Sequence, residues 1–447
     1  MGAEKDIIIA VELASTAIRA IAGKREPDGS IKVLAYAQEE VTSTIRKGII
    51  DNIEKTQQAL AKVTTALGEK LGVKVKRIYI GLSGQSLHTV ANRVEMPFEN
   101  KELITNETVD KLRDINSGTM YPNAEIKDVI AQEYRIGSRQ VVDPVGMQSD
   151  ALEANFMNII ARTSLEENIR KCVHSVGLEV EEVLITPLAL ADCILPASEK
   201  RSGCALVDMG AETTTICVFS GNILRELSVI PVGGANVTAD IKSLKMDIEE
   251  AEALKKKYGT AFRQEREEKS SRTITISYDR TIQEDTLQEI VEARYEEIIA
   301  NAWEHIKMHE DKILSGIILA GGAARIPDIT KAFAYHASAE MNVRLAKGLP
   351  ENVSIESGVS IGDPERMYNI LGLLLKGKVN CVAEITEETP QQVEEAPENT
   401  VPEKEEVIAP EETPEEQVAT KPKSGKKTIQ NIWGRLRDML TDTEDEE

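Results

Sequence analysis

The sequence has few cysteines, no long apolar run and no excess of positive charge. Its 447 residues include only five cysteines, without a C-x-x-C pair and without a signal peptide at residues 1–6. We therefore expect a reduced, cytosolic protein whose thiols are buried or idle. No apolar run approaches the ~20 residues of a membrane-spanning helix. Lys and Arg number 53 against 75 Asp and Glu, and the net charge of −22 argues against nucleic acid as a partner.

Negative charge is concentrated near the carboxyl end. Residues 384–420 contain 13 Glu, five Pro and one Lys, and no aromatic side chain. A stretch of this composition buries too little apolar surface to offset the entropy lost by ordering it. We therefore expect a disordered acidic linker over residues 384–420, after a folded part that ends near residue 383.

Apolar runs predict an α/β unit at the start of the chain. Strands are expected over Ile7–Val11, Ile18–Gly23 and Ile31–Val41. Apolar positions at helical spacing from Ile53 to Leu71 predict a helix, and Arg77–Leu82 predicts one more strand. The order is strand, strand, strand, helix, strand.

The same order of elements returns about 196 residues later. The predicted elements are strands over Ala205–Asp208, Thr213–Phe219 and Ile223–Val232, and a helix that begins with a capping box of Asp247 and Glu250 and ends before Gly259. A repeated unit implies two similar α/β domains that face each other. Chance similarity between short apolar runs is the alternative.

Two longer segments do not belong to the repeated unit. Residues 84–163 interrupt the first domain and residues 241–312 the second. Their predicted elements are short strands over Val129–Ile136, Ala154–Ala161 and Thr273–Tyr278, and helices near Val109–Asn116 and from about Asp285 to Lys312. A last strand over Gly316–Leu319 leads into a glycine-rich turn, after which Pro327 marks the expected start of a helix.

Three of the predicted strands end in turns of small residues. The turns are Glu12–Thr16, Asp208–Thr214 and Ala320–Ala323. Small residues let backbone N–H groups approach a phosphate closely, and hydroxyl groups add donors. The Asp208 carboxylate suits Mg²⁺, which prefers carboxylate oxygens and retains several waters. An ordinary tight turn is the alternative for each one alone, but their order within a duplicated fold favours a phosphate site.

Two histidines on the predicted helix, His305 and His309, are four residues apart. No third ligand and no H-E-x-x-H motif accompanies them, and a structural zinc ion needs four ligands. We therefore expect a solvated helix face rather than a metal site.

Residues 421–447 predict a basic amphipathic helix. Its apolar side chains recur on one helix face, whereas Arg435 and Arg437 lie off that face. A short basic helix with a Trp, at the end of an acidic linker, is typical of binding in the plane of an anionic membrane surface. Docking on a partner protein or on the body of the chain itself is the alternative. The expected membrane-binding residues are Ile429, Ile432, Trp433, Arg435, Leu436, Met439 and Leu440.

Several motifs match those of a known family. Val232–Ile241 reads Val-Gly-Gly-Ala-Asn-Val-Thr-Ala-Asp-Ile, and Glu249–Gly259 contains Glu-Glu-Ala-Glu-Ala-Leu-Lys followed by Lys-Tyr-Gly. Asp143–Met147 and Leu152–Ala154 read Asp-Pro-Val-Gly-Met and Leu-Glu-Ala, and Ile80–Gly84 ends a predicted strand. Over nearly all of residues 6–380 the chain resembles the bacterial cell-division FtsA family, of the actin/Hsp70/sugar-kinase ATPase superfamily.

The resemblance implies an α/β fold of the actin-like, ribonuclease H-like duplicated type. It has two domains, an inserted subdomain, a disordered acidic linker and a C-terminal amphipathic helix. The expected divisions are 1–83 (domain 1A, first part), 84–163 (inserted subdomain 1C), 164–202 (domain 1A, second part), 203–240 (domain 2A, first part), 241–312 (subdomain 2B), 313–363 (domain 2A, second part), 364–383 (return to domain 1A), 384–420 (linker) and 421–447 (membrane-targeting tail).

The resemblance also implies that ATP and Mg²⁺ bind in a cleft between the two domains, with Asp208 holding Mg²⁺ through water. It assigns no catalytic residue. The expected nucleotide-binding residues are Ser15 and Thr16 in the first phosphate loop, Asp208, Gly210, Thr213 and Thr214 in the second, Gly233 and Gly234 at the phosphates, Glu252 and Lys255 at the ribose and base, and Gly321, Gly322 and Ala323 beneath the adenosine. A solvated i,i+3 pair is the alternative for Glu252 and Lys255.

Both phosphate loops depart from the family pattern. In the first loop Ala14 replaces a glycine and Ala17 replaces a basic residue. In the second loop Ala211 and Glu212 replace glycines, and Thr215 replaces an aspartate. A carboxylate pointing into a phosphate loop is electrostatically unfavourable beside a triphosphate. We therefore expect ATP binding with weak or absent ATPase activity.

The resemblance implies a cell-division protein on the cytoplasmic side of the membrane at the septum. Its body would self-associate into filaments, subdomain 2B would receive the C-terminal peptide of the tubulin-like protein FtsZ, and later division proteins would join. Filaments would turn one weak membrane helix and many weak peptide contacts into firm attachment through avidity. The alternative is an active actin-like ATPase of the pilus-assembly or chaperone type that does not act in division.

Overall fold

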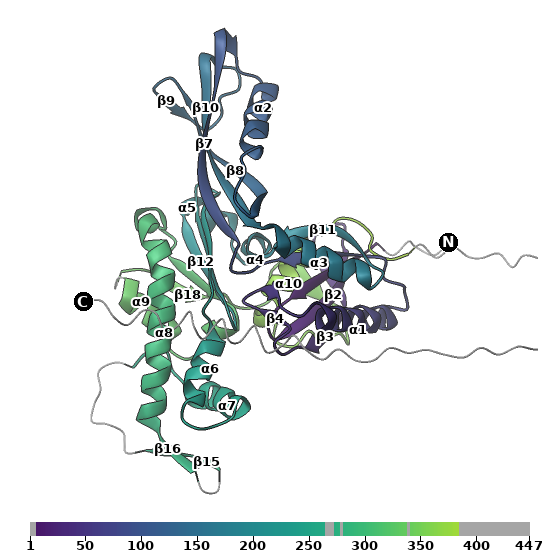
Figure 1. Ribbon diagram of the computed structural model, residues 1–447, viewed down its shortest axis with the longest axis vertical. Helices are drawn as coiled ribbons and strands as arrows, with labels where there is room; N and C mark the ends of the chain where they lie inside the picture. The colour runs from purple at the N-terminus through teal and green to yellow at the C-terminus, as the bar shows by residue number, and fades with distance from the viewer. Residues whose placement is uncertain (1–5, 264–271, 278–279, 338–339, 384–447) are drawn as a thin grey trace, which may run out of the picture. The chain divides into compact units, whose positions relative to one another are not determined.

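The computed structural model describes residues 6–263, 272–277, 280–337 and 340–383, which Figure 1 draws in colour. Within these ranges no helix is long and apolar enough to cross a membrane. The predicted acidic linker, residues 384–420, and the predicted tail, residues 421–447, lie outside the described residues. Both stay predictions.

The first sheet has six strands in the order β11-β6-β1-β2-β3-β19. The strands are β1 (Ile7–Leu13), β2 (Ala17–Arg25), β3 (Ile31–Glu40), β6 (Arg77–Leu82), β11 (Glu179–Ile185) and β19 (Val353–Ile355). The helices around it are α1 (Ile53–Leu71), α3 (Thr163–Ser175), α4 (Thr186–Ile194) and α10 (Tyr368–Lys376), whereas α5 (Ala197–Ser202) packs on β13 (Thr214–Ser220). Helix α1 packs on β2 and β3, and α10 packs on β1, β2 and β6 and against α4.

The second sheet has five strands in the order β14-β13-β12-β17-β18. The strands are β12 (Cys204–Met209), β13 (Thr214–Ser220), β14 (Ile223–Ile230), β17 (Ile317–Ala320) and β18 (Val343–Leu345). The helices of this part are α6 (Gly234–Lys242), α7 (Ile248–Tyr258), α8 (Glu284–Ile306) and α9 (Ile329–Ala337). Figure 1 shows the long helix α8 lying along this sheet, where it packs on β13 and β14.

The two sheets repeat one topology. The strand orders β11-β6-β1-β2-β3 and β18-β17-β12-β13-β14 have the same sequence of parallel and antiparallel pairings. The predicted duplication is therefore confirmed. Strand β19, which the expected divisions place in the second domain, pairs in parallel with β3 of the first sheet.

The inserted segment forms a four-stranded sheet of its own, in the order β7-β10-β8-β9. Its elements are β7 (His88–Leu103), α2 (Asn106–Ser117), β8 (Ala124–Ile136), β9 (Arg139–Val141) and β10 (Gln148–Arg162), and α2 lies against this sheet (Figure 1). The helix is confirmed, but the prediction of short strands is wrong, because polar residues alternate along long ribbons that are half exposed. The Thr89 hydroxyl bonds to the backbone of Leu227 at 3.0 and 3.2 Å and ties the insert to β14.

Alternation along β12 decides which side chains face the first repeat. Cys204 and Leu206 belong to the core that also contains α4 and α10, whereas Ala205 and Val207 belong to the core beneath α8. Side chains two residues apart share a face of a strand. Asp208 is therefore directed toward the first repeat, and this direction determines its partner in the site.

The sequence left out several short elements. The most important is helix α6, which starts at two glycines and is stabilised by packing on α7 and α8. The predicted helix from Asp285 to Lys312 is split into α8 and a 3₁₀ turn, and α9 begins at Ile329, two residues after Pro327. Short elements that were also not predicted are β4 (Ile45–Arg46), β5 (Ile49–Ile50), β16 (Arg280–Gln283) and the 3₁₀ turns η1 (Lys307–Lys312), η2 (Gly322–Arg325) and η3 (Pro364–Arg366). Nor were β7, β9, β11, β18, β19, α3, α4, α5 and α10 predicted, whereas β15 (Thr273–Ser277) lies within the strand predicted over Thr273–Tyr278.

The start of α7 is as predicted. The Asp247 side chain accepts from the Glu250 N–H at 2.7 Å, and the Glu250 carboxylate accepts from the Asp247 N–H at 3.3 Å. This capping box satisfies two backbone donors that the first helical turn leaves without partners. Gly259 ends the helix, also as predicted.

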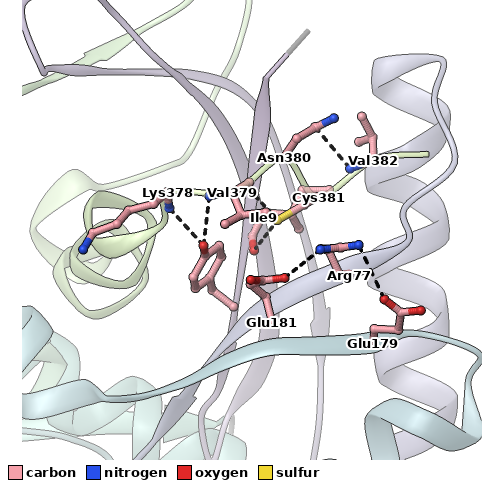
Figure 2. A network of polar contacts seen from close by, with 10 residues as sticks. Ile9, Arg77, Glu179, Glu181, Lys378, Val379, Asn380, Cys381 and Val382 are labelled. Atoms are coloured by element: carbon pink, nitrogen blue, oxygen red, sulfur yellow. Dashed lines mark hydrogen bonds and ion pairs between the residues drawn. The ribbon is translucent and has the colours of Figure 1, made fainter. Parts of the chain in front are cut away.

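The last described segment, residues 378–383, is fixed at the beginnings of β1 and β6 (Figure 2). The Cys381 N–H donates to Ile7 O at 2.7 Å, and the Cys381 carbonyl accepts from the N–H groups of Lys76 and Arg77. The Tyr79 hydroxyl accepts from two further backbone N–H groups of the segment, each at 3.0 Å. Whatever follows residue 383 is therefore rooted on the first repeat.

All five cysteines are buried and free, as predicted: Cys172, Cys193, Cys204, Cys217 and Cys381. Burial raises the pKa of Cys172 to about 11 and that of Cys193 to about 12. Thiols with such values stay protonated at neutral pH and react slowly.

Candidate functional site

The second loop, residues 208–214, is the turn of the β12–β13 hairpin. The Gly210 N–H donates to Thr213 O at 2.8 Å and closes the turn. Helix α6 braces it from below, because the Gly234 N–H donates to Gly210 O at 3.0 Å and the Ala235 N–H to Ala211 O at 2.6 Å. A Cβ at Gly233 would lie 2.6 Å from Gly210 O, so only glycine permits this approach.

This arrangement brings Gly210, Thr213 and Thr214 together with Gly233 and Gly234. The Thr214 hydroxyl donates to Val232 O at 2.9 Å and fixes the end of β13 against the entry to α6. The Gly234 amide, which the sequence assigns to the phosphates, is used to hold the loop. In the structure Gly233 and Gly234 shape the second loop rather than offer a free helix end.

Asp208 is half-buried at the end of β12. Its Oδ2 accepts a hydrogen bond of 3.1 Å from Asn369 Nδ2 on α10, and its other oxygen lies against the backbone of Gly321. Burial raises the pKa of the Asp208 carboxyl to about 6; the Asn369 hydrogen bond acts in the opposite direction, and nearby Glu12 adds to the increase. Asn369 Oδ1 is also buried, and no hydrogen-bond partner is present for it among the described residues. The group is a half-buried carboxylate with an amide neighbour and an uncompensated charge.

The third turn, Ala320 to Ala323, passes directly beneath Asp208. Gly321 has φ = +87°, and a Cβ there would lie 2.4 Å from both Asp208 Oδ1 and Met209 O. Gly322, in contrast, has open space where a Cβ would be. The Tyr295 hydroxyl of α8 donates to Ala323 O at 2.9 Å and holds the turn from the core side.

Glu252 and Lys255 form a half-buried pair at the junction of α6 and α7. Lys255 Nζ lies 2.6 Å from the Glu252 carboxylate and donates to Thr238 Oγ1 at 2.8 Å and to Gly234 O at 2.9 Å. Burial lowers the pKa of Lys255, although Glu252 acts against the change. Gly234 also adjoins Ala323, because a Cβ at Gly234 would lie 3.0 Å from Ala323 Cβ. The pair is therefore part of the site and not the solvated pair given as the alternative.

The first loop, residues 12–17, is the turn of the β1–β2 hairpin and carries Ser15 and Thr16. The Ala14 N–H donates to Ala17 O at 3.1 Å and closes it. Glu12, at the end of β1, forms a buried ion pair of 2.8 Å with Arg19 on β2. Ser15 and Thr16 belong to the first repeat, and Glu12 of the same hairpin is near enough to Asp208 to affect its pKa.

Sequence reasoning missed Arg19, Asn369 and Tyr295. The signal for Arg19 was available, because residues 17 and 19 share a face of β2 and the basic residue absent at 17 returns at 19. Arg19 Nε is buried, without a hydrogen-bond partner among the described residues. The partners Asn369 and Tyr295 lie 161 and 28 residues from their contacts, and no local pattern indicates such pairs.

The donor set fits an Mg–nucleotide complex in two respects. Among the described residues the half-buried Asp208 carboxylate has no cationic partner, and the oxygen of Asn369 beside it is unsatisfied, so a hydrated cation would compensate both. The turn at Gly322 leaves space where a side chain would otherwise project. Direct coordination by a cluster is not indicated, because no three His, Cys, Asp or Glu side chains in the described ranges are grouped to hold a metal ion.

The prediction of a solvated face at His305 and His309 is wrong. His305 Nδ1 lies 2.7 Å and His309 Nε2 lies 3.1 Å from the two oxygens of Glu226 on β14. Burial acts to raise the pKa of Glu226, but the two imidazole hydrogen bonds outweigh it and hold this pKa below its usual value. The cluster fastens the end of α8 to β14, a contact that helical spacing alone does not reveal.

Two family models match parts of the chain that the fold keeps separate. The model described as "Cell division protein FtsA" matches residues 205–365, which span the second repeat. The model described as "SHS2 domain inserted in FTSA" matches residues 84–160, which are the inserted sheet.

Relatives along the whole body agree with these matches. Cell division protein FtsA of Enterococcus hirae is 30% identical over 339 residues, covering 73% of this chain and 75% of the relative. The protein of the same name from Porphyromonas gingivalis is 27% identical over 393 residues, covering 85% and 80%. A solved chain of a PilM–PilN type IV pilus biogenesis complex has a TM-score of 0.57 at 14% identity, covering 82% of this chain and 97% of that chain, and supports the actin-like duplicated fold alone. The chain belongs to the FtsA family of cell-division proteins.

Proposed function

We propose that this protein is a cell-division adaptor that tethers the FtsZ ring to the cytoplasmic membrane. The observation that carries the proposal is the FtsA-type insert, residues 84–160, set into the first repeat of an actin-like fold. The relatives that share most of the chain carry the cell-division name. The pilus-assembly alternative has less support, because the 14% identity to the PilM–PilN chain bears on fold alone.

The body would bind ATP with Mg²⁺ between the first and second loops. Asp208 would hold hydrated Mg²⁺, Thr213 would face the phosphates, Thr214 would hold the second loop in place through its bond to Val232 O, and Gly322 would leave room for the adenosine. Support comes from the uncompensated Asp208 carboxylate, the open space at Gly322 and the buried Glu252–Lys255 pair. Bound Mg²⁺ would supply the positive charge that this carboxylate and the phosphates require.

Hydrolysis would be weak or absent. The two residues that depart most from the family pattern, Glu212 and Thr215, lie in and beside the second loop, and Thr215 pairs across the hairpin with Asp208. A threonine in this register offers no carboxylate to activate water. ATP turnover above background that is lost in Thr215→Val would contradict this part of the proposal.

Membrane attachment would come from the tail, residues 421–447, through the linker that follows residue 383. The root of that linker is the hydrogen-bonded segment 378–383 on the first repeat (Figure 2). Binding by one short helix is weak, so filaments of the protein would provide the avidity that a ring requires. Subdomain 2B, residues 241–312, would bind the FtsZ C-terminal peptide, and later division proteins would join at the septum.

Vesicle co-sedimentation of FtsZ tests the tether. FtsZ should pellet with anionic vesicles in the presence of the full chain and not with a version that ends at Thr420. If the shortened version binds vesicles equally well, the assignment of the tail is wrong. If the full chain pellets but FtsZ does not, the tail assignment survives and the FtsZ partner is wrong.

A charge-matched pair of variants sharpens this test. Leu436→Glu adds one negative charge on the apolar face of the predicted helix, and Asn431→Glu adds the same charge off that face. We expect Leu436→Glu to abolish pelleting and Asn431→Glu to weaken it only slightly, because burial of the apolar face drives insertion. Equal loss in both variants would indicate binding by net charge alone.

A further inference from the structure

The Glu212 side chain of the second loop reaches the first repeat, as the Asp208 side chain does. The Glu212 carboxylate accepts a hydrogen bond of 2.6 Å from the backbone N–H of Lys47. The sequence places this carboxylate inside the phosphate loop, but in the structure it extends out of the loop and across to the other repeat. The contact joins two segments that are 165 residues apart.

Lys47 is held in an unusual conformation that presents this N–H. Lys47 and Gly48 form the two-residue turn between β4 and β5, with φ of +51° and +75°. Two successive positive φ values are typical of a type I′ hairpin turn, in which the N–H of the first central residue points out of the turn. The Glu212 carboxylate satisfies that donor.

Lys47 also contacts the root of the insert, through its carbonyl group on the next peptide. Lys47 O accepts the N–H of Gln85 at 3.1 Å, and a Cβ at Gly48 would lie 2.4 Å from Gly84 Cα. Gly84 and Gln85 are the residues through which the chain leaves β6 for the inserted sheet, which begins at His88. A displacement of the Lys47 turn would therefore shift the root of the insert directly.

The backbone of the second loop cannot yield in place of the side chain. It is closed by the Gly210–Thr213 hydrogen bond and braced by two α6 amides. A charge that enters the loop must act on the group that is free to rotate, and that group is the Glu212 carboxylate. Two negative charges at close range repel each other, and the carboxylate of this exposed contact can move away into solvent.

We propose that Glu212 distinguishes a nucleoside triphosphate from a diphosphate and reports the difference to the inserted subdomain. This inference rests on the proposed nucleotide site. With diphosphate bound, Glu212 keeps its hydrogen bond to Lys47. The γ-phosphate of a triphosphate repels the carboxylate, the hydrogen bond to Lys47 breaks, and the turn at Lys47 and Gly48 loosens together with the Gln85 contact.

Hydrogen exchange of the full chain, resolved by mass spectrometry at the Lys47 and Gln85 amides, tests the proposal. Two variants separate the acceptor from the charge: Glu212→Ala removes both, and Glu212→Gln keeps an oxygen acceptor without the charge. Asp28→Asn is the control, because Asp28 also accepts a backbone N–H, from Ser30 at 2.9 Å, in a turn between β2 and β3.

Without nucleotide, the Lys47 amide should exchange about tenfold faster in Glu212→Ala than in the native chain, the factor expected for loss of a hydrogen bond to a charged acceptor. Mg–AMPPNP should accelerate exchange at Lys47 and Gln85 in the native chain and in Asp28→Asn, whereas Mg–ADP should not. Glu212→Gln should show no difference between the two nucleotides. An equal response of Glu212→Gln and the native chain overturns the proposal.

Binding of fluorescent ATP and ADP analogues, measured in parallel, tests the nucleotide site separately from the role of Glu212 as a sensor. If both analogues bind and exchange at Lys47 does not differ between them, Glu212 is no sensor and the nucleotide site stands. If neither analogue binds, the proposed nucleotide site fails and the sensor fails with it.

Discussion

The first and second loops have the same pattern of backbone hydrogen bonding, but they differ in whether a cation neutralises their acidic side chain. Each is closed by a hydrogen bond from an N–H to the carbonyl three residues later, Ala14 to Ala17 and Gly210 to Thr213. Each loop follows a strand whose second-last residue is acidic, Glu12 in β1 and Asp208 in β12. Glu12 has the guanidinium of Arg19 at 2.8 Å, whereas the partner of Asp208 within the described part of the chain is the uncharged amide of Asn369.

This difference shows how a duplicated fold can divide the work of one site. The first loop carries its own cation, so its carboxylate is neutralised without a ligand. The second loop leaves a half-buried carboxylate whose pKa is raised to about 6, and it directs a second carboxylate, that of Glu212, to the opposite repeat. A bound Mg–nucleotide would therefore act chiefly on the second loop.

The largest effect is expected where the second loop and the third turn meet. Gly321→Ala should lower the free energy of unfolding by about 4 kcal/mol, because the new Cβ meets Asp208 Oδ1 and Met209 O at 2.4 Å and the residue keeps φ = +87°. Gly29→Ala is the matched control, since Gly29 has the same φ and open space around it, and it should cost about 1 kcal/mol. Equal costs in urea denaturation would mean that the contact with Asp208 contributes nothing.

The second-largest loss of stability is expected when the cation of the first loop, Arg19, is removed. Arg19→Met leaves Glu12 buried without its partner and should cost about 3 kcal/mol, as is typical when one member of a buried ion pair is removed. The double variant Glu12→Gln, Arg19→Met removes both charges and should regain most of this loss. If the double variant is as unstable as Arg19→Met, packing rather than charge explains the effect of Arg19.

Removal of the uncompensated charge of Asp208 in the second loop should instead raise the free energy of unfolding. The pKa of Asp208 is about 6 in the folded chain against 3.8 in the unfolded chain, so the folded chain binds more protons between these values and its stability falls as the pH rises through them. Asp208→Asn should therefore add about 3 kcal/mol above pH 7 and almost nothing near pH 3. Denaturation across this range, with EDTA and without nucleotide, measures the difference, and a gain independent of pH would contradict it.

The sequence predicts the repeat well because each strand of it is a local apolar run, and such runs can be recognised without knowledge of tertiary contacts. The Arg77–Leu82 and Ile53–Leu71 elements match β6 and α1 to the residue, and the capping box of Asp247 marks the start of α7. In contrast, α6 begins at two glycines with poor helix propensity, and its existence depends on packing against α7 and α8. The β4–β5 hairpin has only two residues in each strand, too few for a periodic signal.

The site was predictable in its loops and not in its partners. Resemblance to the family motifs identifies Asp208, Gly321 and the Glu252–Lys255 pair, because these residues lie in contiguous stretches of sequence. The contacts that set their chemistry, Asn369 with Asp208 and Lys47 with Glu212, join residues that are 161 and 165 positions apart. Only the folded register of two sheets brings such residues together.

The smallest effect on stability is expected at the start of helix α1. Helices α1 and α6 begin differently. Helix α1 has a side-chain cap, in which Asn52 Oδ1 accepts the Lys55 N–H at 2.9 Å, whereas α6 starts at Gly233, whose own N–H donates to Asn236 Oδ1 at 3.0 Å. Asn52→Ala should lower the free energy of unfolding by about 1 kcal/mol, and Asn52→Gly by only a few tenths, because glycine tolerates the capping position. Urea denaturation at constant m-value measures both. An equal loss in the two variants would show that Asn52 acts through contacts other than the cap, and the start of α1 would then depend on tertiary packing in the same way as α6.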